Sequence, residues 1–287
     1  MTTIDAPTGA ALITTWKTAP TQTINAGGVE FAYRQLGPSR GVPVVFLTHL
    51  AAVLDNWDPR VVDGIAAKHR VITFDNRGVG ASSGSTPTTI EEMASDAVTF
   101  IRALGFDQVD LFGFSMGGMI AQVIAQEEPK LVRKMILAGT GPAGGEGIEK
   151  VTRITYLDAA RGLLTHQDPK QFLFFTRTPN GRAAGKAFLA RLQERTHDRD
   201  KTISVRAFRA QLKAIHRWGQ QAPADLASIH QPVLVMNGDS DRMVPTKNTV
   251  DLDRRLPNSQ LVVYPDAGHG GVFQFHEDFV KRALAFL

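Results

Sequence analysis

The chain of 287 residues contains no cysteine. Disulfide frameworks, thiolate nucleophiles and sulfur-ligated metal clusters are therefore excluded. It also lacks any run near the ~20 apolar residues that a membrane helix needs, and the apolar run at 10–13 is too short for a secretory signal. Hydrophobic residues at 43% and charged residues at 21% lie near globular averages. We therefore expect a soluble, cytoplasmic protein with no membrane partner.

Patterns for nucleotide, metal and nucleic-acid binding are lacking as well. Gly78-Val79-Gly80 has neither the third glycine nor the downstream acid of a dinucleotide fingerprint. His49 has no second histidine or carboxylate at ligand spacing. Segment 150–220 carries 15 Lys and Arg against 5 Asp and Glu, but they are spread along amphipathic stretches, as on solvated helix faces. We expect no cofactor, no metal and no nucleic-acid partner; the sequence indicates no oligomeric state.

What the sequence does contain is an alternation of strand and helix signals. A hairpin pattern with a Gly27-Gly28 turn comes first. Thr89 and Glu92 then form a capping box for a helix that Gly105 ends. Apolar runs rich in β-branched residues predict buried parallel strands, so the fold class is α/β with helices flanking the sheet. These runs are 44–48, 71–74, 109–112, 134–137, 233–236 and 261–264.

The alternation stops at the glycine-rich stretch 139–147 and resumes only at Pro232. Helical patterns without a convincing strand fill the interval. We therefore predict a helical cap at 141–221, inserted into an α/β core formed by 21–140 and 222–287. Residues 1–20 lack periodicity and are predicted to be a loosely held N-terminal extension.

The candidate nucleophile is Ser115, in the pentapeptide Gly113-Phe114-Ser115-Met116-Gly117. A predicted strand precedes it and a helical pattern follows, which is the context of a nucleophile elbow. The glycines two residues before and after the serine allow neighbouring backbone to pass closely.

A serine nucleophile requires a base, which in turn needs a carboxylate to orient it. His269 follows the last strand and has glycines on both sides, whereas His276 lies on a predicted helix and is better explained as structural. Asp241 and Asp239 both follow the preceding strand. We favour Asp241 because it lies farther out, where it can bend toward the next loop, while Asp239 could cap the turn. The order Ser115, Asp241, His269 is the one that this kind of sheet produces.

An oxyanion hole needs two backbone N–H groups. Met116, directly after the nucleophile, is one candidate donor, and Leu50, in the loop after the first parallel strand, is the other. His49 either shapes this loop or contacts substrate. We also name Trp57 and Trp218 as candidate substrate contacts.

Taken together, these motifs resemble the α/β-hydrolase superfamily across residues 25–287, and most of all its serine esterase and cofactor-free haloperoxidase-like branch. The resemblance implies an eight-stranded, mostly parallel sheet, a helical cap after the sixth strand and a cofactor-free catalytic triad of Ser115, His269 and Asp241. Thr48-His49 stands where many relatives carry His-Gly, which is a departure from the pattern. The matching segments are 44–50 with Trp57, 74–82, 113–117, 238–241 and 267–270.

The function predicted from these features is that of a carboxylesterase-like serine hydrolase. It would cleave a small ester or lactone through an acyl-enzyme on Ser115. Perhydrolysis of the haloperoxidase type and carbon–carbon bond hydrolysis are alternatives, because both use the same triad. A catalytically weak ligand-binding protein of the same fold is the alternative from another class.

Overall fold

The computed structural model describes residues 15–287, so the apolar run at 10–13 lies outside the described residues. Eight strands form one sheet in the order β1-β2-β4-β3-β5-β6-β7-β8. The pairs β1–β2 and β2–β4 are antiparallel, and every pair from β4 to β8 is parallel. The predicted fold class is therefore confirmed. The strands are β1 (Gln22–Ala26), β2 (Val29–Leu36), β3 (Val44–Leu47), β4 (Val71–Phe74), β5 (Val109–Phe114), β6 (Val132–Ala138), β7 (Val233–Gly238) and β8 (Ser259–Tyr264).

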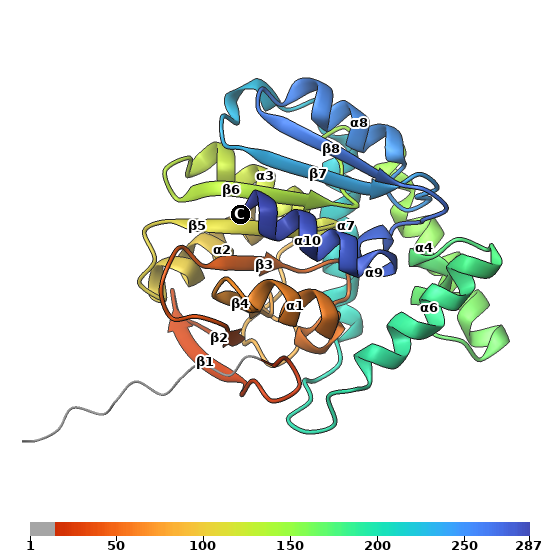
Figure 1. Cartoon of the computed structure of the whole chain (residues 1–287), viewed down its shortest axis with the longest axis horizontal. Helices are drawn as coiled ribbons and strands as arrows, with labels where there is room; N and C mark the ends of the chain where they lie inside the picture. The colour runs from red at the N-terminus through yellow and green to blue at the C-terminus, as the bar shows by residue number, and fades with distance from the viewer. Residues whose placement is uncertain (1–14) are drawn as a thin grey trace, which may run out of the picture.

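Helices cover both faces of this sheet (Figure 1). In the central strand β5, Leu111 packs into the apolar cluster under α2 and α3, while its neighbour Phe112 packs into the cluster under α1 and α10. Successive side chains of a strand point to opposite faces, so a continuous apolar run serves both clusters. The helices of this core are α1 (Pro59–Ala66), α2 (Ile90–Ala103), α3 (Met116–Glu127), α8 (Thr246–Arg255), α9 (Gly271–Gln274) and α10 (His276–Phe286), with short 3₁₀ turns at Leu54–Asn56 and Leu226–Ser228. A further 3₁₀ turn, Ile148–Lys150, opens the segment between β6 and β7.

Local signals set where these helices begin. Asp58 precedes Pro59 at the start of α1, and its carboxylate accepts a hydrogen bond from the N–H of Arg60 at 3.0 Å. Thr89 caps α2 by accepting from the N–H of Glu92. Each cap satisfies an N–H group that has no partner within its helix.

A run of helices separates β6 from β7, as the sequence pattern predicted. Figure 1 shows α4 and α6 beyond the end of the sheet toward which the parallel strands point. The described helices agree with the predicted helical character of 141–221, whereas the division into core and cap domains stays a prediction. The helices of this segment are α4 (Val151–Thr165), α5 (Lys170–Phe174), α6 (Pro179–Leu192) and α7 (Val205–Gln220).

The segment before β1 is held firmly where the structure describes it. The Trp16 side chain is 1% exposed, and the Arg34 guanidinium lies 5.1 Å from the centroid of its ring. Arg195, which follows α6, donates to the carbonyl oxygens of Trp16 and Ala19 at 3.0 and 2.9 Å. The prediction of a loosely held extension is therefore wrong for residues 15–20, because a distant arginine satisfies their carbonyl groups.

A buried ion pair fastens this region to the sheet. Arg34 on β2 is 0% exposed and donates to Asp55 at 2.7 Å. Asp55 also accepts from the N–H of Asp200, which follows α6, at 2.8 Å. The pair thus links β2, the turn before α1 and the segment between α6 and α7.

Removing Asp55 is expected to destabilise the fold strongly. In Asp55→Ala the Arg34 guanidinium stays buried but loses its carboxylate partner, which costs about 3–5 kcal/mol of unfolding free energy. Urea unfolding monitored by tryptophan fluorescence measures the change. Glu128→Ala, which breaks the exposed Arg102–Glu128 pair, is the control and should have little effect. Equal midpoints for the Asp55 variant and the control would contradict the expectation.

Candidate active site

Ser115 lies at the sharp turn between β5 and α3. Its φ is 57° and its ψ is −117°, which is a rare backbone conformation for a residue with a side chain. A Cβ on Gly113 would lie 2.5 Å from the carbonyl oxygen of Gly117, and one on Gly117 would lie 1.9 Å from that of Leu47. Both positions therefore require glycine, as the elbow pattern predicts.

The turn brings Ser115 to the predicted histidine and aspartate. Ser115 Oγ lies 2.8 Å from His269 Nε2, and His269 Nδ1 lies 2.7 Å from Asp241 Oδ2. Asp241 Oδ1 accepts from the N–H groups of Met243 and Val244 at 2.7 and 3.0 Å. Ser115, His269 and Asp241 are all buried. Hydrogen bonds therefore connect the hydroxyl through the imidazole to a carboxylate that two backbone N–H groups hold in place.

Asp239, the rival carboxylate, serves a different purpose. It accepts from the N–H groups of Asp266 and Ala267 at 3.1 and 3.4 Å. These residues belong to the loop that carries His269. Asp239 therefore fixes the backbone of the loop, while Asp241 contacts the imidazole itself.

The loop after β3 lies against the same serine. Leu50 and His49 line one cavity together with Ser115. The N–H of Ala51 donates to the side-chain oxygen of Gln211, a buried residue of α7, at 2.8 Å. Met116 is the first residue of α3, so its N–H has no partner within the helix. Sequence reasoning missed Gln211, because nothing in an amphipathic helix pattern tells which polar side chain turns inward.

The cavity beside Ser115 is small and mostly apolar. Its volume is about 30 Å³, enough for roughly one water. Its only polar side chains are those of His49, Ser115 and His269. An acyl group is larger than this volume, so side chains that line the cavity must move to admit one. The lining residues are His49, Leu50, Ser115, Met119, Val151, Leu173, Phe174, Ile215, Met243, Val244 and His269.

Trp57 and Trp218 do not line this cavity, and the prediction that they contact substrate is not supported. Trp57 is 1% exposed and packs edge-on against Phe46 in the core, with ring centroids 4.9 Å apart. Trp218 is buried, and its indole N–H donates to the carbonyl of Gly141 at 3.2 Å. Both rings contribute to packing rather than to the wall around Ser115. His49 is the one member of the predicted contact set that lies at the cavity.

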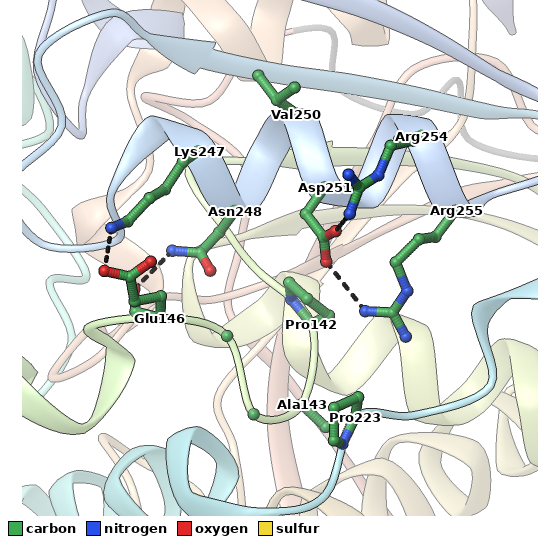
Figure 2. A pocket seen from close by; sticks show the side chains of 12 residues that line it. Pro142, Ala143, Glu146, Pro223, Lys247, Asn248, Val250, Asp251, Arg254 and Arg255 are labelled. Atoms are coloured by element: carbon green, nitrogen blue, oxygen red, sulfur yellow. Dashed lines mark hydrogen bonds and ion pairs between the residues drawn. The ribbon is translucent and has the colours of Figure 1, made fainter.

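A larger hollow lies between the 142–146 loop and α8 (Figure 2). Its volume is about 320 Å³, and neither serine nor histidine lines it. Asp251 pairs with both Arg254 and Arg255, and Lys247 pairs with Glu146. Because these charges satisfy one another, we assign no chemistry to this hollow.

Two carboxyl groups meet where the segment between α6 and α7 contacts the core. The N–H of Leu54 donates to Asp75 Oδ1 at 3.0 Å and to Asp200 Oδ2 at 3.2 Å. Burial and the adjoining Asp200 carboxyl raise the pKa of Asp75 well above its usual value near 3.8. Asp75 also accepts from the N–H of Ala81, so it braces the 75–82 loop. The partner Asp200 carries no local signal that could have revealed the pair.

The raised pKa of Asp75 predicts a specific pH dependence of stability. The folded state keeps a proton on Asp75 that the unfolded chain releases above a pH of about 4. The contribution of this pair to the free energy of unfolding is therefore complete below that pH and is lost as the pH rises through the pKa of Asp75 in the folded state. Asp200→Asn removes the facing carboxyl and should make this decline smaller between pH 5 and 9, while the effect of burial remains. Urea midpoints across this range measure it, with exposed Asp107→Asn as the control. Parallel profiles for wild type and Asp200→Asn would contradict the interpretation.

Within residues 15–287, no helix combines the length and apolar character needed to cross a membrane.

The sheet order and the elbow define the class to which the chain belongs. A family model described as alpha/beta hydrolase fold matches residues 42–275, and the chain is a member of that family. A protein provisionally named the non-heme bromoperoxidase BpoC of Mycobacterium tuberculosis is 28% identical over 272 residues, covering 90% of this chain and 97% of the relative. One provisionally named the carbamate hydrolase RutD of a Caulobacter species is 26% identical, covering 92% and 98%. The solved structure of an alpha/beta hydrolase fold protein from Chitinophaga pinensis is 40% identical, with a TM-score of 0.90 and coverage of 95% and 98%. The family supports hydrolase activity.

Proposed function

We propose that this chain is a serine hydrolase that cleaves a small carboxylic ester or lactone through an acyl-enzyme on Ser115. One observation carries the proposal. Hydrogen bonds of 2.8 and 2.7 Å join Ser115 Oγ to His269 and His269 to Asp241. This arrangement is the one that activates a serine hydroxyl, because the imidazole can take its proton while the carboxylate holds the ring in the required tautomer.

In acylation, Ser115 Oγ attacks the carbonyl carbon as its proton moves to His269 Nε2. The tetrahedral intermediate carries a negative oxygen, for which the N–H groups of Leu50 and Met116 are the proposed donors. The carbon–oxygen bond to the leaving group then breaks, and His269 gives the proton to the departing oxygen. In a lactone, that oxygen stays attached to the acyl group.

In deacylation, water replaces the alcohol. His269 Nε2 accepts a proton from the water as its oxygen attacks the acyl carbon, and the same two N–H groups hold the second oxyanion. Collapse breaks the bond to Ser115 Oγ, which regains its proton from His269. The carboxylic acid leaves and the enzyme returns to its starting state, so the cycle consumes one water and needs no other co-reactant.

A fluorophosphonate probe tests this assignment directly. The probe forms a covalent bond only with an activated serine, so peptide mass spectrometry is expected to find the label on Ser115 of the folded protein. Denatured protein is the control and should not react. Intact folded protein that leaves Ser115 unlabelled would favour the ligand-binding alternative.

Perhydrolysis is a second candidate, favoured by the relative named as a non-heme bromoperoxidase. Hydrogen peroxide would replace water in deacylation, giving a peracid and free Ser115, and the peracid would then oxidise halide in solution. Measuring carboxylic acid and peracid over a range of peroxide concentrations separates the two reactions. If the enzyme gives carboxylic acid and peracid in the same ratio as nonenzymatic acyl transfer to water and peroxide, perhydrolysis is removed as a candidate.

A further inference from the structure

His49 is a polar residue in the wall of the mostly apolar cavity beside Ser115. Its side chain is 4% exposed and lines the cavity with Ser115 and His269. The imidazole packs edge-on against Phe114 and Phe174, with ring centroids 5.4 and 5.1 Å apart. These contacts on two sides fix the orientation of the ring.

The hydrogen bond of the ring decides where its proton lies. His49 Nδ1 is 2.8 Å from the carbonyl oxygen of Leu50. A carbonyl oxygen only accepts, so Nδ1 carries the proton. Burial, with a smaller contribution from the positive charge of Lys170, lowers the pKa of His49 to about 3. Near pH 7 the ring is therefore neutral, and Nε2 holds a free lone pair.

That lone pair has no partner within the part of the chain that the structure describes. His49 Nε2 is buried and accepts no hydrogen bond there. The other polar side chains of the cavity, Ser115 and His269, are bonded to each other. Buried acceptors are costly when left unpaired and are nearly always satisfied, so His49 Nε2 is free to accept from a group that enters the cavity.

The shared lining of the cavity indicates where that donor lies on a substrate. His49 and Ser115 line the same small cavity, so a group that touches His49 lies close to a carbonyl bound at Ser115. The acyl group stays on Ser115 through both halves of the proposed reaction, whereas the leaving group must reach solvent. A buried acceptor beside the serine therefore suits a donor on the acyl group.

Resting on the proposed function, we propose that His49 Nε2 accepts a hydrogen bond from an O–H or N–H group of the acyl part of the substrate. The preferred substrates are accordingly esters or lactones of acids that carry a hydroxyl or amino-type donor one or two carbon atoms from the carbonyl. Acyl groups without a donor leave Nε2 unpaired once they displace water from the cavity.

Matched esters test the proposal. Phenyl glycolate and phenyl fluoroacetate differ by a hydroxyl against a fluorine, which is similar in size and withdraws electrons but donates no hydrogen bond. Phenyl 3-hydroxypropanoate and phenyl 3-fluoropropanoate form the same pair with one more carbon. Each kcat/KM is divided by the hydroxide-catalysed rate of that ester, which removes intrinsic reactivity. We expect wild type to favour the hydroxy ester of at least one pair by about tenfold.

Two variants assign the preference to His49. His49→Phe keeps a ring of similar size without an acceptor, and it should reduce the hydroxy-to-fluoro ratio to within about twofold of unity. His49→Gln retains both a donor for Leu50 and an acceptor, so it should keep part of the ratio. If His49→Phe fails to fold, the hydroxy-to-fluoro ratios of wild type and of His49→Gln test the role of His49.

The outcomes separate this inference from the proposed function. Ser115→Ala is assayed with each ester, and turnover equal to wild type would overturn the proposed function itself. Turnover that depends on Ser115 with no hydroxy preference in either pair would overturn only the role of His49. The same holds if His49→Phe slows all four esters equally, because His49 would then act on the loop or on a water common to all substrates.

Discussion

Replacing Ser115 with alanine is expected to lower kcat/KM for phenyl acetate by about 10⁴-fold or more. The variant lacks the oxygen that forms the acyl bond, and His269 is left without a hydroxyl to deprotonate. The remaining groups can only polarise the carbonyl toward a water, which recovers a small part of the rate. Phenol release under initial-rate conditions measures the effect.

The substitution is also structurally clean, so a loss of rate can be attributed to chemistry. Although Ser115 is the N-cap of α3, its side chain makes no capping hydrogen bond. Removing Oγ therefore deletes the contact with His269 Nε2 and leaves the start of the helix unchanged. Circular dichroism and the unfolding midpoint should match wild type. Ser95→Ala, at an exposed position on α2, is the matched control and should retain full activity. A Ser115→Ala protein with more than a tenth of wild-type activity would exclude the serine mechanism.

The sequence predicted the features that depend on local patterns. Parallel strands buried on both faces read as apolar runs, and capping residues such as Asp58 mark where helices begin. The meeting of Ser115 with His269 was also predictable, because loops that follow parallel strands lie at the same edge of the sheet. The distances of 2.8 and 2.7 Å agree with that expectation.

Contacts between distant segments could not be predicted in this way. Arg195 binds carbonyls of the segment before β1, and Asp200 meets Asp75, although no periodicity links these positions. The sequence does not show either which way an aromatic side chain points. Trp57 follows the predicted oxyanion loop closely in sequence, yet its ring turns into the core beside Phe46. Which side of a loop a ring occupies is decided by the space that other elements leave, and a single sequence does not encode that space locally.

Asp241→Asn is expected to lower kcat for phenyl acetate by about 10³- to 10⁴-fold while changing the shape of the site very little. Asp241 Oδ1 accepts from the N–H groups of Met243 and Val244, so in the variant this position must be the amide oxygen. The NH₂ group then takes the position of Oδ2, 2.7 Å from His269 Nδ1, and can only donate there. His269 Nδ1 must become an acceptor, which moves the ring proton to Nε2.

A protonated Nε2 cannot accept the hydroxyl proton of Ser115, so the variant keeps its geometry and loses its base. The loss should appear in kcat with KM little changed, because substrate binding does not involve the tautomer. Asp239→Asn is the matched control: its carboxylate accepts from the N–H groups of Asp266 and Ala267 and from the hydroxyl of Ser240, and it makes no hydrogen bond with the imidazole. It should therefore cost far less activity than Asp241→Asn. Equal losses in the two variants would mean that this pair of carboxylates only supports the loop, and that His269 does not need Asp241 to hold its proton on Nδ1.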